Sequence, residues 1–192
     1  MTRSVQDSWG LLKAYLEANY PDILEDAYES NAAAVKTYEE KTGLTFPEEL
    51  VAYFQSFPGE VPYIFPAEDE YDDMASGSIS PEASLDAWEM LKDLLQTGEF
   101  TDREPSETSP GVVKAWWTLD WIPFADNGAG DFLCVDLGPS DGGSTGQVIT
   151  HSHESGGHRT IASSLAEYIE QVADGICSGT WQFDADYGFS RP

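Results

Sequence analysis

Apolar residues in the first part of the chain recur with the spacing of α-helices. Four of them follow one another at intervals of four, three and four positions: Val5, Trp9, Leu12 and Leu16. Such intervals place the side chains on one face of a helix, which predicts a helix with one buried side. Pro21 interrupts the pattern. We expect a second helix to start there and to run to Gly43, a residue suited to a C-terminal cap.

Three further segments have the pattern of amphipathic helices: 45–57, 80–98 and 163–175. Pro47 suits the first turn of the first segment, and Gly98 suits the C-terminal cap of the second. In the third segment, either Ser163 or Ser164 can cap the N-terminus, and Glu167 lies three residues after Ser164, as in a capping box.

The second half of the chain alternates between apolar and polar positions, as β-strands do. Short runs of this kind, separated by turns rich in Gly, Asn, Asp, Pro and Ser, occur at 121–125, 131–137, 146–153 and 158–162. Consecutive short strands favour an antiparallel meander over alternating strands and helices. Together with the helices they predict an α/β fold of the α+β type, in which helices wrap a mostly antiparallel central sheet.

Two apolar segments fit more than one structure. "VPYIFP" at 61–66 has the composition of a short strand, but its two prolines disfavour a place inside a sheet. "WQFDADYGF" at 181–189 is expected to form either a last strand or a packed tail.

The length of the chain suits one domain. Its 192 residues, of which 41% are hydrophobic, can bury one sizeable core. We expect a single domain over 1–192, with 1–20 as an N-terminal helical extension. The span 60–110 is expected to contain an acidic insertion, because fourteen acidic residues between Glu60 and Glu107 face only two basic ones.

The charge of the chain narrows its possible partners. Thirty-five Asp and Glu residues against nine Lys and Arg give a formal net charge of −26. Such a chain repels nucleic acid and anionic membrane surfaces, since contacts with phosphate need Lys and Arg. The charge favours a basic protein partner. The alternative interpretation is that the acidity serves only solubility or a saline habitat.

The same sequence predicts a soluble, cytoplasmic protein. It shows neither an apolar leader nor a run of the roughly 20 apolar residues that a membrane span needs. Cys134 and Cys177 lie far apart and lack CxxC spacing, so we expect free thiols.

The glycine-rich stretch 126–146 lacks the residues that nucleotide or calcium sites require. "GPSDGGST" at 138–145 approaches a phosphate-binding loop, but Ser144 stands where that loop needs a lysine. "DNGAGD" lacks the third glycine of a dinucleotide loop, and Asp126, Asn127 and Asp131 have the wrong spacing for a calcium loop. We therefore expect turns here, and no cofactor.

The three histidines of the chain are the remaining candidates for chemistry. His151 and His153 alternate on an expected strand and would share a face, with His158 returning beside them after a turn. Together with Asp126 or Asp131 they could bind Zn²⁺. Polar residues beside a Gly- and Ser-rich turn need no such explanation, so we expect no metal and keep a metal-dependent enzyme only as a second alternative.

The order of residues in the second half of the chain resembles the SUKH superfamily. This group includes fungal regulators of cell-wall assembly and glucan synthesis and many bacterial immunity proteins. The matching positions are Trp121, Pro123, Phe124, Asp126, Gly130, Asp131, Asp136, Gly146 and Val148. The resemblance extends over residues 30 to 175 and implies a mostly antiparallel sheet wrapped by helices, without catalytic activity.

This resemblance implies a non-enzymatic binding protein. We expect an immunity protein that neutralises a cognate bacterial toxin, a basic protein such as a nuclease or deaminase. The alternative is a regulatory protein-interaction module linked to cell-wall synthesis. The expected contact surface combines an acidic run with aromatic anchors, and otherwise the run is a solvated loop. Its residues are Tyr63, Phe65, Glu68, Asp69, Glu70, Tyr71, Asp72 and Asp73.

Overall fold

The computed structural model describes residues 2–25, 27–28, 32–67 and 75–191. It contains α-helices at Val5–Asn19 (α1), Ala32–Thr42 (α2), Glu48–Ser56 (α3), Pro81–Thr97 (α4) and Leu165–Cys177 (α5). A 3₁₀ helix, η1, spans Pro21–Leu24. The strands are Gly77–Ser78 (β1), Trp121–Asp126 (β2), Phe132–Asp136 (β3), Gln147–His151 (β4), Thr160–Ala162 (β5), Gln182–Asp184 (β6) and Gly188–Ser190 (β7).

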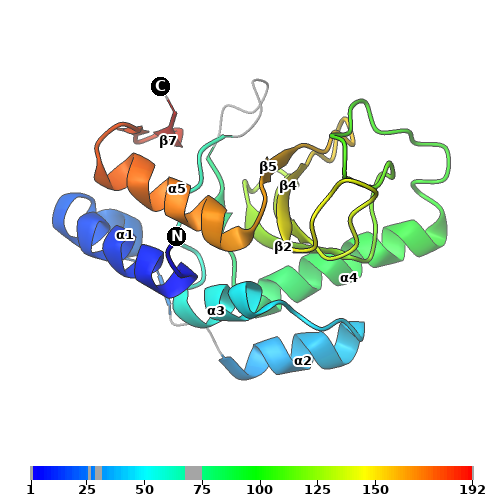
Figure 1. Ribbon diagram of the computed structural model, residues 1–192, viewed down its shortest axis with the longest axis horizontal. Helices are drawn as coiled ribbons and strands as arrows, with labels where there is room; N and C mark the ends of the chain where they lie inside the picture. The colour runs from blue at the N-terminus through cyan, green and yellow to red at the C-terminus, as the bar shows by residue number, and fades with distance from the viewer. Residues whose placement is uncertain (1, 26, 29–31, 68–74, 192) are drawn as a thin grey trace.

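The first five strands form one antiparallel sheet in the order β1-β2-β3-β4-β5. Helices pack to one side of and below this sheet in the view: α1 and α5 lie side by side, α2 and α3 lie at the lower edge, and α4 runs past β2 (Figure 1). The expected α+β fold with an antiparallel meander is therefore confirmed. The strand β1 was not expected, since a two-residue strand leaves no alternation to detect.

Both faces of the sheet are buried, because different segments cover them. Phe132, Cys134 and their partners on β4 share one face, where Trp117 from the 99–120 segment packs against His151 at a ring distance of 5.1 Å. Leu133 and Val135 lie on the opposite side of the strand and are buried as well. Burial on two sides explains why all five residues of β3 are buried.

Strand β2 is held in place by hydroxyl groups from two helices. Its register shifts between Pro123 and Ala125, so that Phe124 occupies a bulge. Tyr53 of α3 donates a hydrogen bond to the carbonyl of Phe124 at 2.8 Å, and Ser84 of α4 donates to the carbonyl of Pro123. These bonds fix the end of β2 relative to the helices, and the Phe124 carbonyl also accepts from the Ile79 N–H at 3.3 Å.

The prediction of one helix from Pro21 to Gly43 is wrong. After η1 the chain leaves helical geometry, and the backbone of Tyr28 pairs with that of Gly59 through hydrogen bonds of 3.0 and 3.4 Å. Gly59 permits this approach because a Cβ there would lie 2.5 Å from the Tyr28 ring. Backbone pairing with a residue distant in sequence is thus present at Tyr28, where the local pattern predicts a helix.

The other helix predictions are confirmed. Ser80 and Ser164 cap the N-termini of α4 and α5, and Gly98 ends α4 in the left-handed conformation at φ 84°. The expected N-terminal helix is α1, and its apolar side, including Leu12 and Leu16, belongs to the same buried cluster as the sheet. Residues 181–189 contribute to a two-stranded hairpin, β6–β7.

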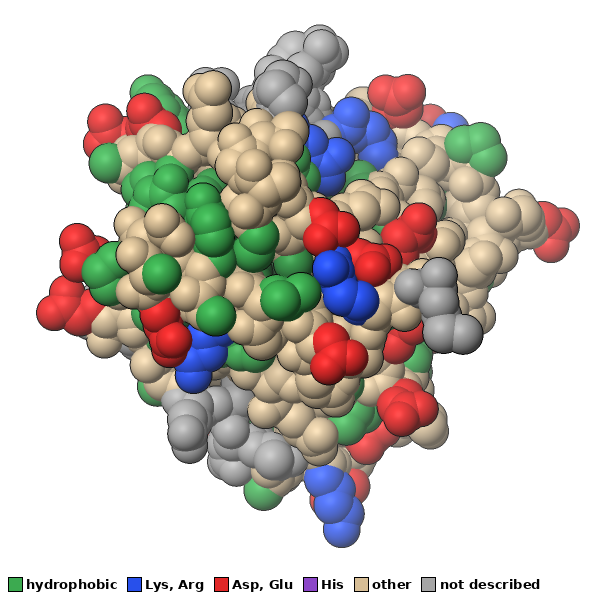
Figure 2. All heavy atoms as spheres, turned by 60° about the vertical axis from the view of Figure 1, so that its left-hand side comes forward, with side chains coloured by type: hydrophobic (Ala, Val, Ile, Leu, Met, Phe, Trp, Pro, Cys, Tyr) green, Lys and Arg blue, Asp and Glu red, His purple; other side chains and the backbone are tan. Residues whose placement is uncertain are grey.

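Among the helices in the described part of the chain, none has both the length and the apolar composition for crossing a membrane. The face that carries α1, α5 and the C-terminal hairpin bears acidic side chains spread widely over it, with fewer basic ones between them (Figure 2). Cys134 is buried, Cys177 is half-buried, and both are free thiols, as expected.

Candidate functional site

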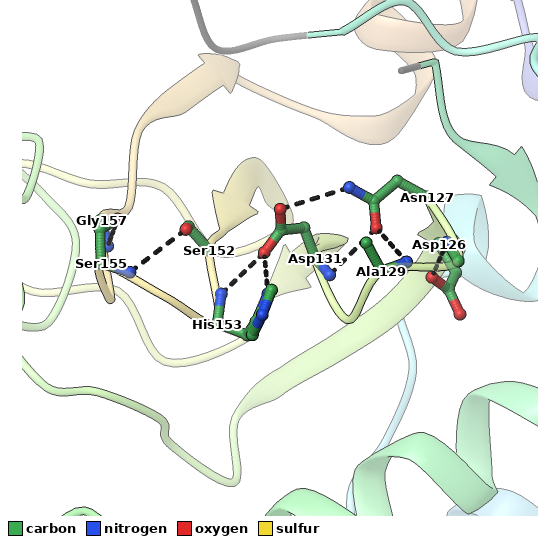
Figure 3. A network of polar contacts seen from close by, with 9 residues as sticks. Asp126, Asn127, Ala129, Asp131, Ser152, His153, Ser155 and Gly157 are labelled. Atoms are coloured by element: carbon green, nitrogen blue, oxygen red, sulfur yellow. Dashed lines mark hydrogen bonds and ion pairs between the residues drawn. The ribbon is translucent and has the colours of Figure 1, made fainter. Parts of the chain in front are cut away.

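The turn between β2 and β3 carries the most distinctive residues of the sequence, and side chains of the turn itself hold its shape. Asp126 Oδ1 accepts a hydrogen bond from the Gly128 N–H at 2.6 Å. Asn127 Oδ1 accepts from the N–H groups of Ala129 and Asp131 at 2.9 and 3.2 Å (Figure 3). These are turns in which Asp and Asn satisfy nearby backbone donors. Asp126 and Asn127 therefore shape the backbone here.

Asp131 ties this turn to the turn after β4. Its Oδ1 accepts from the backbone N–H of His153 at 2.7 Å and lies 2.9 Å from Nδ1 of the same residue (Figure 3). Its Oδ2 accepts from Asn127 Nδ2 at 3.3 Å. Gly130 precedes this aspartate with a φ of 101°, a backbone conformation that favours glycine.

A groove of about 600 Å³ lies on one side of the turn, and we call it the β1 groove. Its lining comes from the segment after α3, from β1 and its neighbours, from α4 and from the turn: Glu60–Tyr63, Ala75, Gly77–Ile79, Ala83 and Asp126–Ala129. Two of these residues, Glu60 and Tyr63, have left-handed backbones at φ 60° and 59°. Such conformations are costly for residues with a Cβ.

A second cavity, of about 300 Å³, lies on the other side of the turn, and we call it the α4 pocket. Its lining is mostly apolar and aromatic, with a few polar groups: Met90, Leu91, Leu94, Glu99, Phe100, Arg103, Trp116, Gly130, Phe132, His151 and His153. The Arg103 guanidinium lies 5.0 Å from the centre of the Trp116 ring, a cation–π arrangement. The turn after β2 thus forms a wall shared by two hollows.

His151 borders the α4 pocket without a polar partner. It is 1% exposed, and neither ring nitrogen has a hydrogen-bond partner among the residues that the structure describes. Burial, with His158 nearby, lowers the pKa of His151 to about 3, so the ring is neutral near pH 7. A buried imidazole with two unsatisfied nitrogens costs stability, since it loses its hydration without replacement.

The three histidines form only part of the arrangement that their spacing suggested, since His158 does return beside His151, with ring centroids 5.4 Å apart. Strand β4 ends at His151, and His153 lies beyond it, half exposed and bound to Asp131. His158 is buried, with Nε2 at 2.8 Å from the Ala115 carbonyl and Nδ1 at 3.3 Å from the Thr150 carbonyl. Within the described ranges, no three His, Cys, Asp or Glu side chains come together in a geometry that could hold a metal ion.

The other positions that carry the resemblance lie in the sheet or in its turns. Asp136 is fully buried, and it accepts hydrogen bonds from Gln147 Nε2 at 2.8 Å and from the Gly138 N–H at 3.0 Å. Burial raises the pKa of the Asp136 carboxyl, and these bonds oppose the rise. The remaining members are Trp121, Pro123, Phe124, Gly146 and Val148.

The expected contact residues fall into three groups. Glu68, Asp69, Glu70, Tyr71, Asp72 and Asp73 lie outside the described residues. Phe65 is fully buried, with its ring 6.1 Å from Phe57, so it supports the segment from inside and does not present its ring at the surface. Tyr63 is half-buried and lines the β1 groove, where a contact role stays a prediction.

The sequence interpretation did not single out Glu60 or His151 as members of hollows. Pro58-Gly59 predicts a turn just before Glu60, but it does not predict that Glu60 itself has a left-handed backbone and lines the groove. For His151, the spacing indicated a strand face correctly, but the absence of a polar partner depends on which segments cover that face.

Comparison with known proteins agrees with the order of residues around this site. The sequence profile of the SMI1/KNR4 family (SUKH-1) matches residues 30–171. A glucan synthesis regulatory protein from Neurospora crassa is 22% identical over 216 aligned positions, which cover 95% of this chain and 40% of that protein. This chain therefore spans well under two thirds of that relative.

Two further relatives match over shorter stretches. A KNR4/SMI1 homolog from Yarrowia lipolytica is 39% identical over 66 residues, covering 34% of this chain and 9% of that protein. The cell wall biosynthesis/cell cycle regulator smi1 of Schizosaccharomyces pombe is 32% identical over 78 residues, covering 40% and 16%. The relatives from Neurospora crassa and Schizosaccharomyces pombe are named as regulators. Because the family profile spans more than half of the chain, this protein belongs to the SMI1/KNR4 family (SUKH-1).

Proposed function

We propose that this protein is a non-enzymatic regulatory domain that acts in cell-wall synthesis by binding another protein. The observation that carries the proposal is the family match over residues 30–171, together with relatives named as regulators of glucan synthesis and of cell-wall biosynthesis. The relatives favour this regulatory interpretation over the toxin-neutralising immunity protein that we expected first.

The chemistry of the chain supports a binding role. The candidate carboxylates and amides of the motif, Asp126, Asn127, Asp131 and Asp136, accept hydrogen bonds from backbone groups or from neighbouring side chains of the fold. The two hollows beside the turn offer concave, partly apolar surface, which suits side chains of a partner. The net charge of −26 favours a basic partner.

Deletion of the gene in its source organism tests the proposal. We expect the incorporation of labelled sugar into cell-wall polysaccharide to change, and the intact chain to restore it. A matched control is the Phe124→Asp variant, which places a charge in the core next to Tyr53 and should not fold or restore the wall. An unchanged wall in the deletion strain, combined with sensitivity of that strain to a toxin from neighbouring cells, would support immunity instead.

A further inference from the structure

The β1 groove combines apolar walls with negative charge. Pro62 and Ile79, both half-buried, supply aliphatic surface, and the carboxylates of Glu60 and Asp126 are the ionisable acids among its lining residues. None of the described residues that line it is Lys or Arg, and neither carboxylate takes part in a salt bridge in the described part of the chain. The groove therefore lacks a cation of its own.

Of the two carboxylates, Asp126 is the one that a cation supplied by a partner would stabilise more. It is half-buried, and its hydrogen bond from the Gly128 N–H engages Oδ1. Burial raises the pKa of its carboxyl, which means that the charged form is poorly solvated in the free protein. A positive group placed against Oδ2 would offset this loss of hydration.

The backbone around the groove holds two residues in costly conformations. The left-handed Glu60 donates its N–H to the Ser78 carbonyl at 3.0 Å, and the left-handed Tyr63 accepts from the Phe189 N–H at 3.2 Å. These long-range bonds keep both conformations in place, and both side chains border the groove as a result. Strain that the surrounding structure maintains is typical of segments where binding surfaces form.

We propose that the β1 groove binds an arginine side chain from a basic segment of the partner protein. This inference rests on the proposed function and names the chemistry of its partner. The aliphatic part of the arginine lies along Pro62 and Ile79, and the guanidinium meets the carboxylates of Asp126 and Glu60. Arginine suits the site better than lysine, because the guanidinium is less strongly hydrated and can also stack on the Tyr63 ring.

Binding of a labelled peptide of alternating arginine and glycine tests the proposal. Fluorescence anisotropy gives the affinity, and ¹⁵N-resolved NMR maps the contact. We expect amide shifts to concentrate at Gly77, Ala83, Gly128 and Ala129, which border the groove. The same peptide with citrulline in place of arginine keeps the shape without the charge, and we expect it to bind at least about fivefold more weakly.

A pair of matched double variants separates local contact from general attraction. Asp126→Asn with Glu60→Gln removes both charges in the groove, and Asn retains an oxygen for the Gly128 N–H. Asp93→Asn with Asp102→Asn removes the same net charge from exposed positions that line neither hollow. We expect the first pair to weaken binding at least about fivefold and the second less than about twofold.

Three outcomes would overturn the proposal: absence of binding, equal loss in both double variants, and equal binding of the citrulline peptide. Expression of the intact chain or of the groove variant in the deletion strain distinguishes failure of this proposal from failure of the proposed function. If the intact chain restores the wall and the groove variant restores it equally, the groove is not the regulatory contact. If the deletion strain has a normal wall, the function is wrong even where arginine binding in the groove is found.

Discussion

Asp131 binds both the backbone and the side chain of His153, through hydrogen bonds from N–H at 2.7 Å and a contact of 2.9 Å to Nδ1. One carboxylate thus joins the turn after β2 to the turn after β4, across 22 positions of sequence. Both partners are partly exposed, with side-chain exposures of 26% for Asp131 and 46% for His153. The pair shapes the wall between the two hollows.

Removal of the Asp131 carboxylate should lower the free energy of unfolding more than removal of the His153 imidazole. Asp131→Ala loses both bonds to His153 and also the bond from Asn127 Nδ2. We expect its free energy of unfolding in urea to be about 1–2 kcal/mol lower than that of the native chain. His153→Ala loses only the side-chain contact, so we expect about 0.5 kcal/mol. Equal effects of the two variants would show that the backbone bond contributes nothing.

The free energy of unfolding should decrease as the pH is lowered, and His151 should contribute to this decrease. The pKa of this buried ring is lowered to about 3, so the unfolded chain binds more protons below the ordinary histidine value of 6.5. The contribution of the neutral ring to folding is complete above pH 6.5 and is lost as pH falls towards 3. Within that window, we expect a loss of about 1.4 kcal/mol per pH unit from this group.

The His151→Phe variant isolates this effect. Burial also lowers the pKa of His158 and raises that of Asp136, but both groups remain in the variant. Urea unfolding at pH 7.5 and pH 5.5 should therefore show that the variant gains about 1 kcal/mol or more relative to the native chain at the lower pH. A constant difference between the two proteins would contradict the buried, neutral ring.

Gln147 should be important for the buried Asp136. Its Nε2 donates to Asp136 Oδ2 at 2.8 Å and to the Gly111 carbonyl at 3.0 Å. Gln147→Leu removes the partner of the buried Asp136 Oδ2, whereas the Gly111 carbonyl keeps its hydrogen bond from the Ser140 N–H at 3.0 Å. We expect a loss of about 3 kcal/mol in the free energy of unfolding. The double variant Asp136→Leu with Gln147→Leu should recover part of this loss, which thermal unfolding of both variants would check.

Relief of backbone strain should stabilise the chain at Glu60. Glycine adopts φ 60° without the steric cost that a Cβ carries, although it loses more entropy on folding. We expect Glu60→Gly to raise the free energy of unfolding by about 0.5–1 kcal/mol. Glu60→Ala removes the same carboxylate but keeps the strain, so a similar gain for alanine would rule out the backbone as the cause.

The N-terminal helix should behave as part of the core. Leu12 is fully buried and its neighbour Leu11 is 50% exposed. We expect Leu12→Ala to destabilise the whole chain by about 3 kcal/mol, with one cooperative transition, and Leu11→Ala to cost less than about 0.5 kcal/mol. Separate unfolding of residues 1–20, followed by circular dichroism, would instead support an independent extension.

Local patterns were sufficient where neighbouring residues decide the structure. Helix α4 is an example. It begins after Ser80, it buries the face that carries Leu85 and Trp88, and it ends at Gly98. The meander is another, because Gly- and Asp-rich turns separate its apolar strands. The order of residues from Trp121 to Val148 was also enough to indicate the family, which the profile match confirmed.

The hollows beside the turn could not be inferred in this way. The β1 groove joins residues 60–63 to residues 126–129, and the left-handed backbones of Glu60 and Tyr63 depend on bonds to Ser78 and Phe189. The lack of hydrogen-bond partners for the ring nitrogens of His151 likewise depends on distant residues such as Trp117, which packs against the ring. Sequence patterns describe one element and its ends, whereas a concave surface arises from the meeting of several elements, and only the packed chain decides which ones meet.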